Sequence, residues 1–463
     1  MSSCGMRARR PISPASLVRV LVVALAAAHV PPARAEFGGN VSMVARAFDK
    51  LETLDGLQRC VSYRPVDMYT RLSWDDLGKR HAWAIDTSVR YRLDWGTGKV
   101  QDDHDLDVLI ARATWRSPSR LLGLQLGRIQ SVTGLGWKSF DGARLDFPKL
   151  PHLRVFVVAG LPVELAESGA PDTGSFTWGT GVVGMFPHHG SIGVDYELRR
   201  FGDLTTEETA GFDAAAQFGN THVAVNADFD MVMDEFGETA LVLGQDIARK
   251  HHVEARVVRV QPVTPIDSVF AVFDVNGYDE ARLAYEFNAD SGLSIGGAIS
   301  REDYVDTELT GDQDIDRVSA TARWNGHHEA RHRSELSWLD GWTGSRLALR
   351  HDSDWGLTPR LRIGLGASFQ EFENFARLTA SDQIYAVRTR LVHDHDGRWS
   401  VGAEIEQYFG RERDTLRGML TVGARFGSAR HERPWWGGRL RGGWAPPMTP
   451  GGAASEPSKE IPQ

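Results

Sequence analysis

The chain has 463 residues, of which 24% are charged and 41% hydrophobic, and its formal net charge is −9. This acidic balance disfavours nucleic acid as a partner, because phosphate backbones are bound by basic surfaces. The two cysteines, Cys4 and Cys60, exclude a disulfide-rich secreted module, and the lack of a CxxCH sequence excludes covalently attached haem. We therefore expect no cofactor.

The first 35 residues have the form of an export signal. Basic residues precede a mostly apolar run from 17 to 30, and Ala33-Arg34-Ala35 provides a cleavage site before Glu36. Arg9-Arg10 leaves a twin-arginine signal open. The apolar run is too short to anchor the chain in a membrane. We expect a signal peptide at 1–35 that is cleaved after Ala35.

The next segment, 36–65, is predicted to begin with a short helix. Its apolar residues recur at i, i+3 and i+4 spacing, and Asn40 could cap the helix. Such a helix could lie in the periplasm or inside the lumen as a plug. The apolar residues that carry this prediction are Val41, Val44, Phe48, Leu51 and Leu54.

From about Trp83 to Phe426 the sequence alternates apolar and polar residues, segment after segment. In the last segment Leu420 and Val422 fall on one face and Thr421 on the other. Successive side chains of a strand point to opposite faces, so each segment is predicted to be a strand with one apolar side. The pattern predicts about 20 strands between 82 and 427, with a further one possible at 66–75.

Many such strands behind an export signal predict an all-β fold, namely a transmembrane antiparallel up-and-down β-barrel. We expect about 18–20 strands, within a range of roughly 16–22, over residues 66–427. The Gly-, Pro- and Ser-rich tail at 428–463 is predicted to be disordered. A soluble secreted sandwich or propeller is the alternative, but its strands would be shorter and its apolar side chains would lie inside.

The connections alternate between short turns, such as 218–220 and 325–327, and generally longer polar segments, such as 262–278 and 301–314. Outer-membrane barrels place short turns in the periplasm and longer loops outside the cell. We therefore expect the protein to lie in the outer membrane of a Gram-negative bacterium. The expected partners are the membrane lipid, lipopolysaccharide and the barrel-assembly machinery, with a periplasmic partner left open.

The polar faces of the strands predict which residues line the lumen. Arginines dominate these faces in the C-terminal half, and acids dominate them in the middle of the chain. The charges could simply pair across strands in a water-filled lumen. They could instead form a basic wall opposite an acidic wall, whose field sorts ions. The predicted pore-lining residues are Arg317, Arg323, Arg346, Arg350, Arg362, Arg388, Arg390, Arg417, Arg425, Asp195, Glu197, Asp213, Asp228, Asp230, Glu404 and Glu406.

A short part of the chain resembles alginate-export-like and related bacterial porins. The similar residues are Gly127-Arg128, the Gly-rich stretch 133–137 (Thr-Gly-Leu-Gly-Trp) and 140–145 (Phe-Asp-Gly-Ala-Arg-Leu). The resemblance implies an outer-membrane barrel that passes anionic or neutral solutes. The chain departs from such barrels at its end, because a long tail follows Phe426 instead of a terminal aromatic residue.

Catalytic and metal signals are weak. No G-x-S-x-G, H-E-x-x-H, Walker or Rossmann motif occurs, so we expect no enzyme and no catalytic residue. His393 and His395 could share one face of an extended segment and reach a metal ion. Residues 394–397 are a turn signal, however, and histidines in turns are commonly solvent-exposed. We therefore expect no metal site.

The sequence thus predicts a porin-like channel for passive passage of small polar or ionic solutes. One alternative is a barrel that serves as a sheath or scaffold around a periplasmic partner, such as an electron conduit or an export complex. A barrel enzyme or an adhesin is less favoured. The identity of the solute does not follow from the residues.

Overall fold

The computed structural model describes residues 36–427, apart from parts of the connections between strands. The predictions for the signal at 1–35 and the tail at 428–463 lie outside the described residues. The gaps within the described part are 55–56, 78–81, 97–103, 120, 134, 151, 164–170, 187–189, 249, 262–276, 290, 305–312, 327–329, 343, 375–381, 396–397 and 411–414.

All regular elements of the described residues are strands, and none of these residues forms a helix long and apolar enough to cross a membrane. The strands are β1 Glu36–Leu54, β2 Leu57–Tyr63, β3 Pro65–Leu77, β4 Trp83–Asp94, β5 His104–Arg116, β6 Gly123–Thr133, β7 Gly136–Leu150, β8 Leu153–Pro162, β9 Ser175–Phe186, β10 Gly190–Phe201, β11 Leu204–Phe218, β12 Thr221–Asp230, β13 Glu235–Ile247, β14 His251–Val260, β15 Tyr278–Asn288, β16 Ser294–Tyr304, β17 Gln313–Asn325, β18 Arg331–Gly341, β19 Gly344–Thr358, β20 Leu361–Asn374, β21 Asp382–His395, β22 Trp399–Gly410 and β23 Thr415–Gly427.

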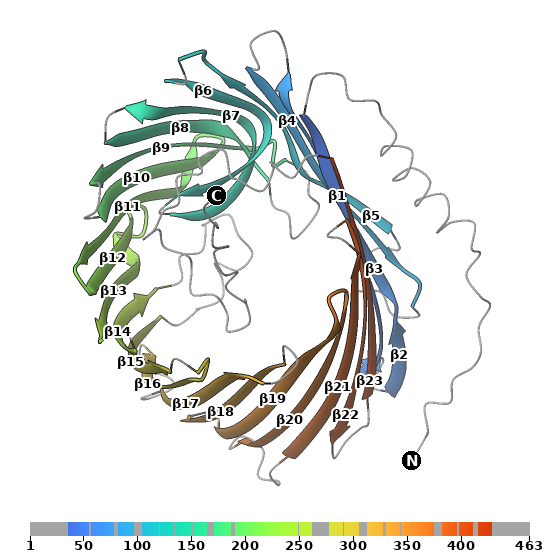
Figure 1. The fold of residues 1–463 in the computed structure, drawn as a ribbon. Helices are drawn as coiled ribbons and strands as arrows, with labels where there is room; N and C mark the ends of the chain where they lie inside the picture. Colours follow the sequence, from blue (N-terminus) through green and yellow to red (C-terminus); the bar gives the residue numbers. More distant parts are fainter. Residues whose placement is uncertain are drawn as a thin grey trace, which may run out of the picture.

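The strands close into one antiparallel ring (Figure 1). From β3 onward each strand pairs with the next, and β1 completes the ring by pairing with β23 on one side and β3 on the other. β2 is the continuation of β3 beyond Arg64, because β1 pairs first with β3 and then, further along, with β2. The ring therefore has 22 strands, the even number expected of a bacterial barrel. This count lies at the upper end of the predicted range.

The predicted helix at the start of the mature chain is wrong, because these residues form β1. Small residues such as Gly38, Gly39 and Ala45 weaken the alternation of this segment, so helical spacing of its larger apolar residues appeared instead. The backbone pairing decides the outcome. β1 is bonded to β23 from Gly38 to Ala47 and to β3 along much of the same length. Without β1 both neighbouring strands would have an unpaired edge.

The two ends of the barrel differ in their connections. We call the end at which β1 begins and β23 ends the terminal end, and the opposite end the distal end. The short turns predicted at 218–220 and 325–327 both join strands at the terminal end. The strand ends joined by the longer connections at 262–276 and 305–312, namely those of β14 with β15 and of β16 with β17, lie at the distal end.

The outer and inner faces of the barrel differ as the alternation predicts. Large apolar side chains of nearly every strand point outward and are exposed, for example Leu365 at 46% and Val387 at 53%. Aromatic rings lie at the terminal end of the outer face, where the Phe37 ring is 5.1 Å from that of Trp74 and 5.7 Å from that of Phe426. This arrangement is the inverse of a soluble barrel and fits a lipid environment.

Candidate functional site: the lumen and its inward hairpin

The lumen is shaped by a hairpin that leaves the barrel wall. β6 pairs with β5 only as far as Arg128, and β7 pairs with β8 only from Phe140 onward. Between these points β6 and β7 still pair with each other, so residues 129–133 and 135–139 form a hairpin that pairs with no described strand of the wall. We call this segment the inward hairpin, and Figure 1 shows the teal β7 ribbon curving inside the ring of strands.

Gly127 allows β6 to leave the wall. Its φ is +111°, and a Cβ at this position would lie 2.2 Å from the carbonyl oxygen of Ala111 on β5. A residue with a side chain could adopt this backbone only with strain. Just beyond the bend, the Arg128 guanidinium donates to the Val108 carbonyl oxygen on β5 at 2.7 Å and to both oxygens of Asp141 on β7. Arg128 therefore ties the hairpin to the wall at its point of departure.

The inward hairpin covers an apolar part of the lumen wall. Ile129 of the hairpin and Phe140, where β7 rejoins the wall, pack with Phe156 and Val158, which point inward from β8, and all four are at most 7% exposed. Gly181 on β9 leaves room for the Phe156 ring, because a Cβ there would lie 2.4 Å from it. Burying large apolar side chains of this kind stabilises a fold by roughly 1.5–3 kcal/mol each, so the cluster holds the hairpin against the wall.

Ion pairs hold the hairpin further along the wall. Lys138 Nζ lies 2.8 Å from Oε1 of Glu197 on β10 and 2.6 Å from Oε1 of Glu207 on β11. The Thr177 hydroxyl also donates to Glu197, at 3.2 Å. At the tip, the Leu135 side chain lies over Gly211 of β11, where a Cβ would be 2.6 Å from Leu135 Cδ2. The hairpin thus extends across the inner faces of β8 to β11.

A buried charge pair lies on β7 next to the hairpin, on the side of the terminal end. Arg144 and Asp146 on β7 are 4% and 0% exposed, and the Arg144 guanidinium lies 4.4 Å above the centre of the Phe156 ring. Arg144 also donates to the hydroxyl of Ser131 in the hairpin. Because each carboxylate and guanidinium here is paired, the charges can stay buried at a tolerable desolvation cost.

The opposite wall, from β17 to β23, has inward arginines that remain accessible to water. Among the predicted pore-lining residues, Arg346, Arg362 and Arg390 are exposed although they point into the ring, and they have no ion pair with a described residue. Others are paired: Arg350 Nε lies 2.6 Å from Asp352, and Arg388 contacts the same carboxylate. On this wall, some of the predicted arginines are therefore paired and others are exposed, while the sorting of ions stays a prediction.

Every predicted pore-lining residue lies on the inward face of its strand, opposite the exposed apolar side chains, but their surroundings differ. Arg317 pairs with Glu302 at 3.0 Å, and Arg417 lies 4.6 Å from the centre of the Tyr408 ring. Arg323 and Arg425 are exposed, and Glu404 and Glu406 are half-buried. These residues belong to the wall that the inward hairpin does not cover.

The acidic set lies on the covered side of the lumen. Asp195 and Glu197 are 3% and 8% exposed, and Asp213 and Asp228 are half-buried. Asp230 accepts hydrogen bonds from the backbone amides of Val232 and Met233, at 2.7 and 3.0 Å, and so caps a distal turn. The acids therefore face the inward hairpin and local backbone more than open solvent.

Sequence alternation did not reveal the inward hairpin, although one signal was available. The residues 155–158 (Val-Phe-Val-Val) are apolar on both faces of their strand, and an inward apolar face requires a cover in a polar lumen. In the sequence, Gly127 contributes only to the resemblance to porins. Its left-handed backbone, which produces the bend, is not readable from the residue type alone.

Histidines occupy both faces of the terminal end. His393 and His395, considered as metal ligands, lie on the outer face, where their rings are 5.4 and 5.1 Å from that of Trp399. The described residues contain one group of at least three side chains placed to share a metal ion, formed by His222, His252 and Glu254 on the inner face.

No protein-family model matches the chain, and no curated protein is similar to it in sequence. Among solved structures, the P pilus usher (PapC) translocation pore is similar with a TM-score of 0.49 and 9% identity, over 84% of this chain and 99% of that chain. A BenF-like porin from Pseudomonas fluorescens Pf-5 is similar with a TM-score of 0.44 and 9% identity, over 85% and 99% of the two chains. The outer membrane protein opdK from Pseudomonas aeruginosa gives 0.43 and 10% over the same shares. Likenesses this distant decide neither the family nor the function of this chain, and the alginate-export-like resemblance of residues 127–145 stays a prediction.

Proposed function

We propose that the protein is an outer-membrane channel for small polar or ionic solutes, with a lumen narrowed on one side by the inward hairpin. The observation that carries the proposal is the exposure of Arg346, Arg362 and Arg390 inside a closed ring. Charged groups that point into a barrel and stay accessible imply water there. At 22 strands, side chains alone cannot fill the interior.

The membrane location rests on the outer face. A closed barrel satisfies all backbone hydrogen bonds of its strands, which is required of a β-structure in hydrocarbon. Exposed apolar residues cover the middle of the barrel, whereas charged outward pairs such as Arg259 with Asp279 lie near the distal end. The distal end would then face the cell exterior and the terminal end the periplasm, with signal cleavage after Ala35.

The two walls give the channel an asymmetric lining. The covered wall offers solutes the backbone and side chains of the inward hairpin, while the open wall offers exposed arginines interleaved with Asp352, Glu404 and Glu406. Rings of charged side chains set the ion preference of pores. Arg346, Arg362 and Arg390, which have no ion pair with a described residue, favour passage of anions over cations of similar size.

The test is conductance of the untagged mature chain after refolding into a planar lipid bilayer. We expect stepwise, ohmic currents and an anion-selective reversal potential under a salt gradient. A folded barrel without conductance would overturn the channel and favour the alternative of a sheath around a periplasmic partner, to which the width of a 22-strand ring is also suited. Folding is checked independently by the faster gel migration of the unheated barrel.

A further inference from the structure

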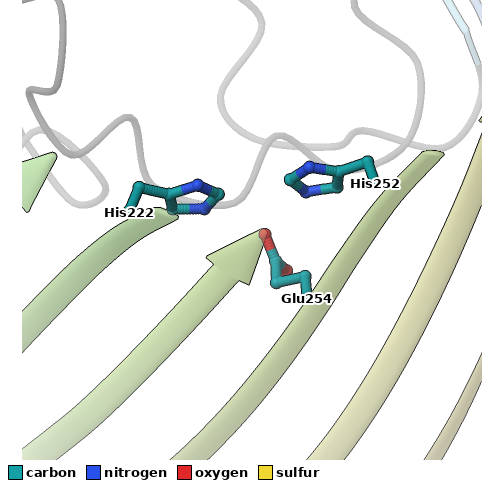
Figure 2. A group of neighbouring side chains, drawn as sticks. All are labelled: His222, His252 and Glu254. Atoms are coloured by element: carbon teal, nitrogen blue, oxygen red, sulfur yellow. The ribbon is translucent and has the colours of Figure 1, made fainter. Parts of the chain in front are cut away.

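Three neighbouring strands bring metal-ligating side chains together at the terminal end of the lumen. His222 of β12 and Glu254 of β14 are both paired in register with Gly244 of the strand between them. His252 lies two residues before Glu254 and therefore on the same inward face. Figure 2 shows the two imidazole rings and the carboxylate facing one another, and their ligand atoms all lie within 4.8 Å of one another.

Gly244 makes this juxtaposition sterically possible. A Cβ at position 244 would lie 1.7 Å from His222 Cε1 and 2.0 Å from its Nε2, so the imidazole ring occupies the place of a side chain on β13. With any other residue there, His222 would be displaced from Glu254. The middle strand thus contributes space, and its two neighbours contribute the ligands.

A further carboxylate orients one of the histidines. His252 Nδ1 lies 2.8 Å from Oδ1 of Asp246, which is the residue opposite His252 on β13. If Nδ1 carries the proton and donates it to this carboxylate, the Nε2 lone pair of His252 is left for a ligand. Metal-bound histidines have such a carboxylate or carbonyl partner almost always, and the partner raises the basicity of the ring.

We propose that His222, His252 and Glu254 bind a divalent transition-metal ion of the zinc class. Two imidazole nitrogens with one carboxylate favour such an ion over Mg²⁺ or Ca²⁺, which prefer oxygen ligands. Three protein ligands leave a fourth position for water from the lumen. All three side chains are half-buried and therefore partly exposed, so an ion can reach them from the terminal end of the lumen. The site does not depend on whether the barrel conducts.

Nearby groups of similar chemistry lie outside the site and supply controls. His251 is the next residue to His252 but points to the outer face, where its Nδ1 is 2.7 Å from the Tyr285 hydroxyl. Glu286 of β15 lies opposite His252 on the inner face, but its carboxylate accepts a hydrogen bond from the Ser294 hydroxyl at 3.0 Å. Removing either side chain leaves the three ligands in place.

The test is a Zn²⁺ titration of the full-length mature barrel, refolded in detergent without a histidine tag, against a chromophoric chelator. We expect one ion per chain in the wild type. His222→Ala and Glu254→Gln should each weaken binding at least tenfold, whereas His251→Ala and Glu286→Gln should not change it. Asp246→Asn should weaken binding by roughly 10- to 100-fold, as expected for the partner of a ligating histidine.

The Co²⁺ form provides a second measurement, because visible absorption bands report a low-coordinate site with nitrogen ligands. The wild type should show them, and Gly244→Ala should lose them while keeping the gel mobility of a closed barrel. No Zn²⁺ binding by the folded wild type would overturn the proposal. Equal binding by the wild type and His222→Ala, or an equal loss in His251→Ala, would overturn it as well.

Discussion

Lys138 Nζ lies 2.6 Å from Glu207 Oε1 although 69 positions separate the two residues in the sequence. This contact joins a hairpin that has left the barrel wall to a strand four places further around the ring. The ion pair is shared with Glu197, which is largely buried. A single cation on the hairpin therefore neutralises two carboxylates of the wall, and its removal leaves both without that partner.

The first prediction concerns this cation. Lys138→Met keeps much of the side-chain length but removes the charge, and hydrogen bonds to charged groups contribute roughly 1.5–3 kcal/mol. The hairpin should then leave the wall more often, so single-channel conductance should rise or fluctuate between two levels. Lys138→Arg, which keeps the charge, is the control and should conduct as the wild type does. Identical current records for all three proteins would show that the hairpin does not narrow the path of ions.

The second prediction concerns the apolar cluster beneath the hairpin and uses two adjacent valines. Val158 is 7% exposed and packs under the hairpin, whereas Val157 is 41% exposed on the outer face. Val158→Ala should lower the free energy of unfolding by about 2 kcal/mol, because it opens a cavity in the cluster. Val157→Ala should cost less. The measurement is the urea midpoint in detergent, and a larger effect at Val157 would mean that the faces of β8 are assigned the wrong way round.

The third prediction tests which face of the barrel meets lipid. Leu365 on β20 points outward, and Ser368 on the same strand points inward. An arginine at the bilayer midplane on the lipid face costs roughly 2–4 kcal/mol. Leu365→Arg should therefore reduce the yield of folded barrel, whereas the same substitution at Ser368 should be tolerated. The readout is the fraction of heat-modifiable protein in the membrane, and impaired assembly only at Ser368 would reverse the register.

Gly366, two residues before Ser368, would be a poor control in this experiment. A Cβ there would lie 2.6 Å from Oδ1 of Asp352, which also binds Arg388. Even a serine would therefore displace a charged pair of the lumen wall. The comparison at Ser368 avoids this contact.

Alternation alone was sufficient to locate β4 through β23, apart from the parts of β6 and β7 that form the inward hairpin, because strands of the wall separate lipid from water and the two solvents select opposite side chains. It failed at β1, where small residues pack against both neighbours and the pairing with β3 and β23 decides the structure. The segment at 66–75, noted only as a possible strand, is β3. Closure of the ring depends on pairing between strands that are far apart in the sequence, so no short stretch of residues reveals it.

The residues of the candidate site also differ in how far the sequence predicts their surroundings. The alternation of a strand predicts that the arginines lie on its inward face. It does not predict the burial of Asp195 and Glu197, because the hairpin that covers them departs from the wall at Gly127. The proposed metal site shows the same limit. His222, Gly244 and Glu254 are far apart in the sequence, and only the register of three strands aligns them.

The last prediction concerns the open wall of arginines. Arg346 and Arg390 are exposed, inward-pointing and without an ion pair to a described residue, so reversing their charge breaks no such pair. The double variant Arg346→Glu and Arg390→Glu should shift the reversal potential under a salt gradient toward cation preference. Arg301→Glu is the control, because Arg301 lies on the outer face near the distal end and contacts Asp303 at 2.8 Å.

The salt dependence separates a lumen charge from an indirect effect. The Debye length falls from about 30 Å at 0.01 M to about 3 Å at 1 M, so the shift should be large in dilute salt and small at molar salt. A conducting double variant with an unchanged reversal potential would leave the channel in place and remove these arginines from its selectivity. A shift of the same size in Arg301→Glu would instead assign the ion preference to the overall charge of the distal rim.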